Sequence, residues 1–433
     1  MKILFFNPTI INKKYVMYEA LRGSAFFRRP NYDAMRIAYL LREHDYTYFD
    51  ERIEDIPKIV PDLIIANVPL NLSDYTAKTV REYWPNHGKI IAFGFFPSIY
   101  PHQCHKNYDS VVVGDIANIL DRIVQDFQSG ALCPQYEALK SKHFRVDRRI
   151  ESRSGFTPIL SQIKTTMGCT CVPASRDYCF EKIMHRELEQ WDINEAAEET
   201  GRIKRKIIFL RDDDFLHDPD YAVDLLEKTW RYKKRWIIQT GLLFNDNRLL
   251  PILREGGVRI IYLKENWLGH NLINDINDRD YRKEKELQIR KIHKNRMIAG
   301  VKIRLGFDNE TENFYRQLCK FLINIKADFI QVAACMPIPG TSTYTRLNEQ
   351  NMIHDDLTSF DQWMPVVHSD RATPQALYTW MESLRDRFYS WDSIIMRNIA
   401  VARNIGFYNS LFFHLIPNLS YRTNFLEKVG YPP

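Results

Sequence analysis

Short apolar runs alternate with amphipathic stretches along residues 1–130. The runs have the length and the β-branched and aromatic content of buried strands, and the stretches between them repeat apolar residues at helical spacing. This alternation is typical of a parallel sheet with helices on both faces, so it predicts a doubly wound, flavodoxin-like or Rossmann-like α/β domain. The expected strands are 2–6, 45–49, 62–68, 89–95 and 110–113, and the expected helices are 32–43, 75–84 and 116–127.

The alternation resumes after residues 131–154, a polar segment that is rich in Lys, Arg and Ser and is expected to be a linker. Six further strands are expected over residues 155–370, and this series predicts a partial (β/α)6 barrel. Residues 371–433 are aromatic and helical in pattern, and are expected to form a C-terminal helical cap. The expected strands are 158–164, 206–210, 235–240, 259–264, 302–306 and 329–334, and the expected helices are 220–232, 247–255, 280–299 and 310–325.

Both predicted architectures bind ligands where their parallel strands end. In the first domain those ends are polar or contain glycine, at residues 7–9, 67–71, 94–98 and 114–115. In the second, a cysteine-rich segment follows the first strand and Asp212-Asp213-Asp214 follows the second. The acidic triplet has two interpretations. It is either a solvated turn that caps the next helix, because Asp favours helix starts, or a functional group at the open end of the barrel.

Composition and charge narrow the classes of partner. The chain has 433 residues, 45% of them apolar and 26% charged, so it can bury large cores in two or three domains. Its net charge of +6 is small for this length and basic residues are interleaved with acidic ones, so a nucleic-acid substrate is not expected. The N-terminal apolar run is too short for a signal peptide, and no run approaches the ~20 residues of a membrane span. We therefore expect a cytoplasmic protein.

Three of the seven cysteines fall within residues 169–179. In a reducing cytosol such a cluster points to a metal or to catalysis rather than to disulfides. Three thiolates without a fourth nearby suit an iron–sulfur cubane with one open iron, whereas a structural zinc site needs four ligands. The alternative is that these are incidental buried cysteines.

Residues 166–180 read Thr-Met-Gly-Cys-Thr-Cys-Val-Pro-Ala-Ser-Arg-Asp-Tyr-Cys-Phe. A strand that ends in Gly-Cys, followed by a cysteine loop whose last cysteine comes after an aromatic residue, resembles the radical S-adenosylmethionine (SAM) superfamily. In that superfamily three cysteines bind a [4Fe–4S] cluster, and SAM chelates its fourth iron. Reductive cleavage of SAM then gives a 5′-deoxyadenosyl radical.

Further segments resemble that superfamily in order along the chain. Two N-terminal segments resemble G-x-H-P-T-x-x-P and D-x-V-V-x-G-E, and five later ones resemble F-x-D-D-N-F, G-x-E-S, G-x-P-x-E-T, P-x-P-G-T-P-x-Y and R-x-F-Y-S…R. The ordered set is typical of the subgroup with an N-terminal cobalamin (B12)-binding domain, and it covers nearly the whole chain. The seven segments are 93–101, 108–115, 209–215, 263–266, 306–311, 336–344 and 387–397.

Three features depart from that subgroup. The cysteine spacing is C-x-C-x7-C rather than C-x3-C-x2-C, so either Cys171 replaces a missing thiolate in a remodelled loop or the cluster is lost. The first strand is followed by Asn-Pro-Thr-Ile-Ile-Asn and not by Asp-x-His-x-x-Gly, which implies base-off cobalamin without a histidine ligand from the protein. Asp214 stands where Asn is usual, and Asp115 stands where Glu is usual.

The resemblance assigns candidate residues to each cofactor, but it assigns no catalytic residue. The implied [4Fe–4S] ligands are Cys169, Cys171 and Cys179. The implied SAM contacts are Tyr178, Asp213, Glu265, Pro339 and Gly340. The implied cobalamin contacts are Asn7, Asn67, Gly94, Pro97, Ser98 and Gly114.

The implied activity is methylation of an unactivated carbon through a 5′-deoxyadenosyl radical and methylcobalamin. One alternative keeps the fold but catalyses a radical rearrangement, oxidation or cyclisation without methyl transfer. Another is a degenerate, non-catalytic protein that binds a corrinoid or tetrapyrrole. The expected partners are a small-molecule or peptide substrate and an electron donor such as flavodoxin or ferredoxin.

Replacing Cys171 tests which cysteines hold the cluster. Wild-type protein reconstituted anaerobically is expected to hold about four irons per chain. Its absorption spectrum is expected to show a band at about 400 nm, as Cys-ligated cubanes do. Cys171→Ala is expected to lose most of that iron, because a cubane needs all three thiolates. Cys133→Ala, outside the segment, is the control. Wild-type iron content in Cys171→Ala would show that Cys171 is not a ligand.

Overall fold

Two six-stranded sheets organise the chain, which is described by a computed structural model. The contacts divide it into two compact units. The first comprises Met1–Pro158, Thr166–Trp191 and Ile338–Ser342, and the second comprises Ile159–Thr165, Asp192–Pro337 and Thr343–Pro433. The structure describes residues 1–9, 29–138, 140, 145–153, 156–168, 183–185, 187–241, 248–269, 272–307, 309–353, 356–361, 364–368 and 371–422.

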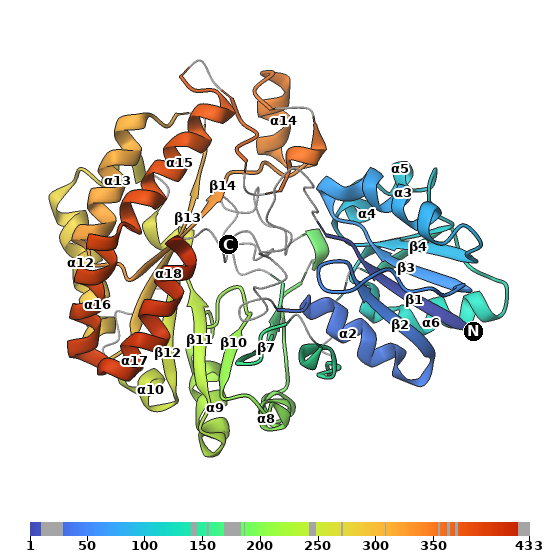
Figure 1. The fold of residues 1–433 in the computed structure, drawn as a ribbon, viewed down its shortest axis with the longest axis horizontal. Helices are drawn as coiled ribbons and strands as arrows, with labels where there is room; N and C mark the ends of the chain where they lie inside the picture. The colour runs from blue at the N-terminus through green and yellow to red at the C-terminus, as the bar shows by residue number, and fades with distance from the viewer. Residues whose placement is uncertain are drawn as a thin grey trace. The chain divides into compact units, whose positions relative to one another are not determined.

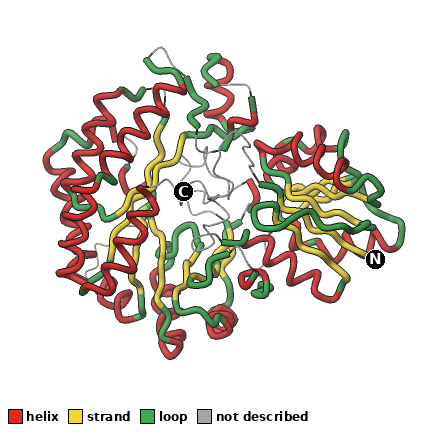
Figure 2. Tube along the Cα trace, viewed as in Figure 1, coloured by secondary structure: helices red, strands yellow, loops and turns green. Residues whose placement is uncertain are grey.

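The first unit contains a fully parallel sheet with the strand order β2-β1-β3-β4-β5-β6 (Figures 1 and 2). The five strands expected from the sequence are confirmed, and a sixth, β6, lies in the segment expected to be a linker. In β6, Tyr136 and Ala138 are buried while their neighbours are exposed, so this short segment pairs with β5 as an edge strand. The strands are β1 (Lys2–Asn7), β2 (Asp45–Asp50), β3 (Leu63–Asn67), β4 (Lys89–Phe93), β5 (Ser110–Gly114) and β6 (Gln135–Ala138).

Helices cover both faces of this sheet because alternate strand residues point to opposite sides. Phe5 joins the core formed with the helices α2 (Tyr32–Leu40) and α6 (Leu120–Gln128). Its neighbour Phe6 instead packs edge to face against Trp84, at the end of the helix α3 (Ser73–Tyr83). This alternation produces the expected doubly wound arrangement.

The second unit contains another fully parallel sheet with the order β7-β10-β11-β12-β13-β14. Each connection between consecutive strands of this sheet contains at least one helix, so the unit forms the predicted partial barrel (Figure 1). The strands are β7 (Leu160–Ile163), β10 (Ile207–Leu210), β11 (Arg235–Thr240), β12 (Val258–Leu263), β13 (Ile298–Leu305) and β14 (Phe329–Ala334). The main crossover helices are α8 (Ile193–Arg202), α9 (Pro219–Thr229), α10 (Leu249–Glu255), α12 (Arg279–Lys294) and α13 (Glu312–Asn324).

One predicted boundary in the second unit is wrong. The helix expected over 280–299 ends at Lys294, and the strand expected at 302–306 begins at Ile298. Arg296 has a positive φ of 56°, which stops the helix, and the apolar residues after it pair with β12 and β14 as a strand. Helical periodicity alone could not distinguish this apolar run from another helical turn.

The C-terminal helices attach to the amino-terminal end of β14. Tyr389 Oη donates to the carbonyl of Ile330 at 2.6 Å and accepts from its N–H at 2.9 Å. Arg397 donates to backbone carbonyls of Asp328 and Phe388 at 3.1 and 2.9 Å. The Tyr389 hydroxyl and the Arg397 guanidinium thus supply hydrogen-bond partners to backbone groups where the sheet meets the cap. The cap comprises α15 (Pro374–Phe388), α16 (Trp391–Ile405), α17 (Phe407–Ser410) and α18 (Ile416–Arg422).

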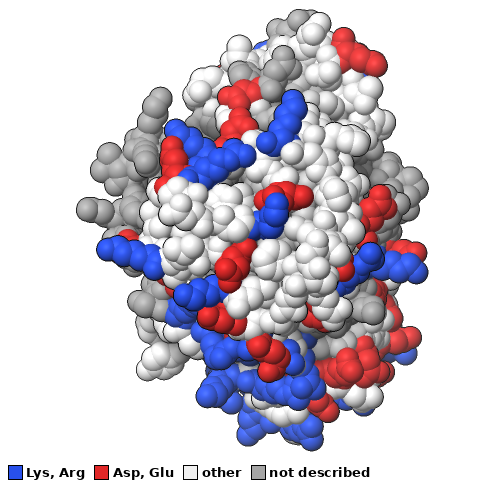
Figure 3. All heavy atoms as spheres, turned by 90° about the vertical axis from the view of Figure 1, so that its right-hand side faces the viewer, with Lys and Arg blue, Asp and Glu red and all other residues white. Residues whose placement is uncertain are grey.

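The surface bears charges of both signs. On the face drawn in Figure 3, basic side chains gather toward the lower end, with acidic side chains among them. This mixture is the one expected from the interleaved sequence and the small net charge. Among the described residues, no helix is long and apolar enough to cross a membrane.

Gly300 gives a test of packing in the barrel. A Cβ at this position would overlap the ring of Tyr262 on the neighbouring strand, because that ring lies against the β13 backbone. Gly300→Ala is therefore expected to lower the free energy of unfolding by about 1–3 kcal/mol, measured by denaturant titration. Tyr262→Leu combined with Gly300→Ala is expected to recover part of that loss relative to Tyr262→Leu alone. An unchanged stability in Gly300→Ala would contradict the described packing.

Candidate functional site

Asp212 links the ends of the first two barrel strands. Its carboxylate is fully buried and accepts hydrogen bonds from the Thr165 N–H at 2.5 Å and from the Thr165 hydroxyl. Thr165 lies between β7 and the segment that leads to the cysteines. Because a buried carboxylate without donors would be costly, these bonds make Asp212 a positioning residue for that segment.

Asp214 has a similar structural role on the other side of the triplet. It accepts from the Thr240 hydroxyl at 2.7 Å and from the Gly241 N–H at 3.1 Å, both at the end of β11. It also accepts from the Leu216 N–H at 3.2 Å and so shapes its own turn. A carboxylate suits this position because all three of these partners are donors.

Asp213, a predicted SAM contact, is the member of the triplet that faces a charged partner. It forms an ion pair with Lys264 Nζ at 2.5 Å, and both side chains are mostly buried, with 21% and 12% exposed. Lys264 follows β12, so this pair joins the ends of β10 and β12. The triplet is thus neither a solvated turn nor a uniform acidic site, since two members position backbone and one forms a cross-strand pair.

Glu265, the second predicted acidic SAM contact, lies in a strongly positive environment. Arg304 Nη2 on β13 is 3.3 Å from its Oε1. Burial by itself raises the pKa of Glu265, but Arg304, Lys264 and Lys302 outweigh it and lower that pKa to about 2. The carboxylate is therefore ionised at neutral pH and can accept hydrogen bonds from hydroxyl or ammonium groups.

Strand alternation explains why these cations gather. Lys302 and Arg304 are half-buried, whereas Val301, Ile303 and Leu305 between and beside them are buried. The apolar positions pack under the outer helices, so the cations lie on the opposite, inner face. Lys264, Lys302 and Arg304 are not among the site residues predicted from the sequence. Charged residues at alternate positions of an otherwise apolar strand were the available signal.

Pro339 and Gly340, two further predicted SAM contacts, form a turn in the first unit. Gly340 has a positive φ of 85°, and the Thr341 hydroxyl donates to the Ile338 carbonyl at 2.7 Å. Asp213 and Glu265 belong to the second unit. The predicted SAM contacts are therefore divided between the two units.

The predicted cluster ligands Cys169, Cys171 and Cys179 lie outside the described residues, as does Tyr178. The ends of their segment are described, however. The short strand β8 (Thr166–Met167) pairs with β9 (Glu189–Gln190) in an antiparallel ladder that closes the base of the loop. Gly168 has a positive φ of 91°, and a Cβ there would lie 2.5 Å from the Glu187 carbonyl oxygen. Within the described ranges, no group of three His, Cys, Asp or Glu side chains could hold a metal.

Two predicted cobalamin contacts, Asn7 and Asn67, meet at the carboxyl ends of β1 and β3. Asn67 Nδ2 donates to Asn7 Oδ1 at 3.0 Å, and Asn7 Nδ2 lies 3.4 Å from Asp50 Oδ2 at the end of β2. Arg52 holds Asp50 with a 2.6 Å ion pair. Although burial raises the pKa of Asp50, the charge and hydrogen bonds of Arg52 lower it overall. A charged carboxylate thus anchors this row of amides.

Gly94, Ser98 and Gly114 form a second group at the same edge. The Ser98 hydroxyl donates to the Gly94 carbonyl at 2.7 Å and accepts from the Gly114 N–H at 3.0 Å. Gly94 has a φ of 109°, and a Cβ there would lie 2.5 Å from Asn67 Oδ1, so only glycine allows the two groups to meet. Pro97 is buried within the short helix α4 (Phe95–Ile99).

The chemistry of these residues fits a cobalamin. Amide, hydroxyl and backbone groups at a parallel-sheet edge can bind the amide side chains of a corrin, and glycine turns allow close backbone approach. The loop after β1 contains no histidine to ligate cobalt. Asp115 also lies at this edge, where it forms an ion pair with Arg36, with an Nη2–Oδ2 distance of 2.7 Å. His185 Nδ1 lies 3.9 Å from the same Asp115 oxygen.

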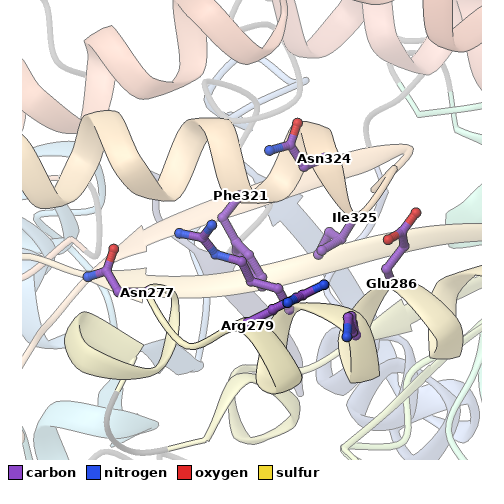
Figure 4. Close-up of a pocket in the computed structure, with 8 residues that line it drawn as sticks. Asn277, Arg279, Glu286, Phe321, Asn324 and Ile325 are labelled. Carbon is purple, nitrogen blue, oxygen red and sulfur yellow. The ribbon is translucent and has the colours of Figure 1, made fainter.

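A separate surface pocket of about 310 Å³ lies between α12 and α13 (Figure 4). Two of its charged side chains already have partners close by, since Arg282 donates to the Ile276 carbonyl and Glu286 pairs with Arg290 at 2.7 Å. It also lies in the outer helical layer, whereas barrels bind ligands at the strand ends. It is therefore not a candidate active site. Its lining includes Asn277, Arg279, Arg282, Glu286, Phe321 and Asn324.

Comparison with known proteins places this geometry in context. No protein-family model matches the chain. The chain is 20% identical over 371 residues to bacteriochlorophyllide d C-12(1)-methyltransferase from Chlorobaculum tepidum, and the match covers 82% of this chain and 81% of that protein.

Two solved structures show the same arrangement of elements. The radical SAM methyltransferase TsrM from Kitasatospora setae, solved with cobalamin and a [4Fe–4S] cluster, matches 81% of this chain and 75% of its own at 14% identity and a TM-score of 0.57. The cobalamin-dependent SAM radical enzyme OxsB, solved with aqua-cobalamin and SAM, matches 99% and 79% at 12% identity and a TM-score of 0.61. The fold is that of cobalamin-binding radical SAM enzymes. The predicted fold class is therefore confirmed.

The low pKa of Glu265 predicts a pH dependence of stability. Its pKa is lower in the folded chain than the unfolded value of about 4.3, so it contributes stability above that pH and loses it as the pH falls toward about 2. Glu265→Gln is therefore expected to have a flatter curve of unfolding free energy against pH over this range. Lys302→Met and Arg304→Met should each raise the pKa of Glu265, so the unfolding free energy of these variants should begin to fall at a higher pH than in wild type. Identical curves for wild type and Glu265→Gln would contradict the assignment.

Proposed function

We propose that this chain is a cobalamin-dependent radical SAM enzyme that methylates an unactivated carbon of its substrate. The main support is the fold, which OxsB shares over 99% of this chain in a structure with aqua-cobalamin and SAM bound. A methyltransferase is also the relative that aligns with 82% of the chain. The ordered motifs from residue 93 to residue 397 agree with both.

Each cofactor has a set of candidate residues in this proposal. Cys169, Cys171 and Cys179 hold the [4Fe–4S] cluster, and Tyr178 lies against SAM. When bound, the cofactors supply hydrogen abstraction from carbon and transfer of a methyl group. The protein binds and orients them and keeps competing reactants out.

Asp213 and Glu265 bind the polar groups of SAM. Glu265 remains ionised because Arg304, Lys264 and Lys302 surround it, so it accepts hydrogen bonds from hydroxyl or ammonium groups at neutral pH. The Asp213–Lys264 pair holds both side chains in place at the ends of β10 and β12. The turn at Pro339-Gly340 supplies backbone contacts.

The cobalamin contacts come from the edge of the first sheet. Asn7 and Asn67 present amide groups that are already oriented by Asp50, and Ser98 is oriented by Gly94 and Gly114. Groups held in place before binding lose little entropy when the cofactor binds. The loop after β1 contains no histidine, so the base-off cobalamin of this proposal has no histidine ligand from that loop.

The comparisons favour a small organic molecule as substrate rather than a peptide. TsrM has been solved with tryptophan as substrate, and the name of the Chlorobaculum tepidum relative specifies a bacteriochlorophyllide. A redox protein such as flavodoxin or ferredoxin would supply the electron that cleaves SAM.

A second candidate function keeps the cofactors but omits methyl transfer. It is favoured by OxsB, which is described as a radical enzyme and shares the fold over a larger part of this chain than TsrM does. Radical rearrangement, oxidation or cyclisation would be its reaction. The unusual cysteine spacing leaves a third reading, a protein that binds a corrinoid or tetrapyrrole without catalysis.

Isotope labelling distinguishes these functions. Anaerobically reconstituted protein is incubated with SAM carrying a deuterated methyl group, cobalamin, a reductant and either tryptophan or bacteriochlorophyllide d. The proposal predicts a product that carries the deuterated methyl group, together with 5′-deoxyadenosine. Deoxyadenosine without label in the product would support the second candidate. Absence of iron uptake would contradict both enzymatic functions.

A further inference from the structure

Exposed apolar side chains concentrate on one part of the C-terminal cap. Seven large apolar residues between positions 391 and 411 are 39% to 84% exposed in the described structure. Single exposed apolar residues are ordinary, but a group of this density within about 20 residues is not. The seven are Trp391, Ile395, Met396, Ile399, Phe407, Tyr408 and Leu411, and we call them the α16–α17 apolar face.

The helix that carries most of this face is firmly held on its other side. Ile394 and Val401 of α16 are buried, and Arg397 donates to backbone carbonyls of Asp328 and Phe388. Since the inner side of α16 is fixed in this way, Ile395, Met396 and Ile399 cannot turn inward. Figure 1 shows α16 and α17 at the outer margin of the helices that surround the second sheet.

The exposed apolar area is large enough for a stable protein interface. With about 200 Å² of accessible surface for each large side chain, the exposed parts of the seven side chains amount to on the order of 800 Å². A standard interface buries about 800 Å² on each partner, whereas the largest apolar patch on a typical monomer is roughly 300–600 Å².

The sequence of the outer stripe of α16 is complementary to itself. Asp392, Met396, Ile399 and Arg403 are spaced four, three and four residues apart, so they lie along one stripe of the helix. All four side chains are exposed. Two copies of this helix packed antiparallel around a two-fold axis would place Asp392 opposite the partner's Arg403, and Met396 opposite the partner's Ile399. Opposite charges thus flank an apolar centre on both sides.

We propose that the α16–α17 apolar face is the interface of a homodimer, in which α16 packs antiparallel against α16 of a second copy. A two-fold interface requires one patch that is complementary to itself, and this stripe meets that requirement in both charge and apolarity. Phe407 and Tyr408, just beyond the end of α16, extend the contact past the amino-terminal end of the partner's helix, where Trp391 lies.

The charge pattern favours a second copy over a lipid surface. Helices that lie on membranes carry mainly Lys and Arg on the polar side, whereas this stripe has an acidic residue at one end and a basic residue at the other. Asp392 would be repelled by anionic lipid but attracted by the partner's Arg403.

Charge-swap variants of the full-length, anaerobically reconstituted protein test the proposal, with mass measured by sedimentation velocity. Wild type is expected to be a dimer at micromolar concentration. Asp392→Arg and Arg403→Asp, each alone, place like charges opposite each other and should weaken dimerisation at least tenfold. The two single variants mixed in equal amounts should form a heterodimer, because each then supplies the charge that the other lacks. The double variant should also dimerise.

Two further variants serve as controls. Met396→Asp should abolish the dimer, because it places a charge at the apolar centre. Trp230→Asp should leave the dimer intact, since Trp230 is 68% exposed but lies in the turn after α9, outside this face. A monomeric wild type at micromolar concentration would overturn the proposal, whether or not it binds anionic vesicles. So would two single variants that fail to associate when mixed, or a dimer that Met396→Asp does not weaken.

Discussion

The parallel pairing of every strand in the second sheet is the constraint on which its candidate site depends. Parallel strands place their carboxyl ends at one edge, so residues far apart in the sequence meet there without long connecting loops. Asp213, Lys264 and Arg304 follow or lie on three different strands, yet Asp213 pairs with Lys264, and Arg304 pairs with Glu265, the residue after Lys264. An antiparallel arrangement would have sent alternate members to the opposite edge.

Carboxylates at this edge take different roles according to the partners that surround them. Asp212 and Asp214 are saturated by backbone and hydroxyl donors, and they fix the loops at the ends of neighbouring strands. Glu265, which is partly exposed, is near Arg304, Lys264 and Lys302, and these cations lower its pKa and keep it ionised. Carboxylates therefore hold loops in place at Asp212 and Asp214, whereas the carboxylate of Glu265 binds a ligand in the proposed function.

The first sheet presents amide and hydroxyl groups at its edge, and the ion pairs Asp50–Arg52 and Asp115–Arg36 lie at the same edge. Asn7, Asn67 and Ser98 are oriented by one another, by Asp50 and by backbone groups at Gly94 and Gly114. Amide and hydroxyl groups suit a large neutral cofactor surface, whereas the charged edge of the second unit suits the ionic groups of SAM. This division agrees with a fold in which OxsB binds both aqua-cobalamin and SAM.

The fold class and eleven of the strands could be predicted from the sequence, because apolar runs of strand length separated by amphipathic helices reflect local geometry directly. Three short strands were not predicted: β6, which is only half apolar, and the two-residue strands β8 and β9. The start of β13 was also misplaced, because one residue of positive φ ends the helix before it. The sequence could not predict which acidic residue of the triplet at 212–214 faces a charged partner, because that partner, Lys264, follows a strand that is distant in the sequence. The tertiary structure also showed that Ile395, Met396 and Ile399 of α16 are exposed. Periodicity records which residues share a helix face, but whether that face meets a core, solvent or a second copy depends on how the whole chain packs.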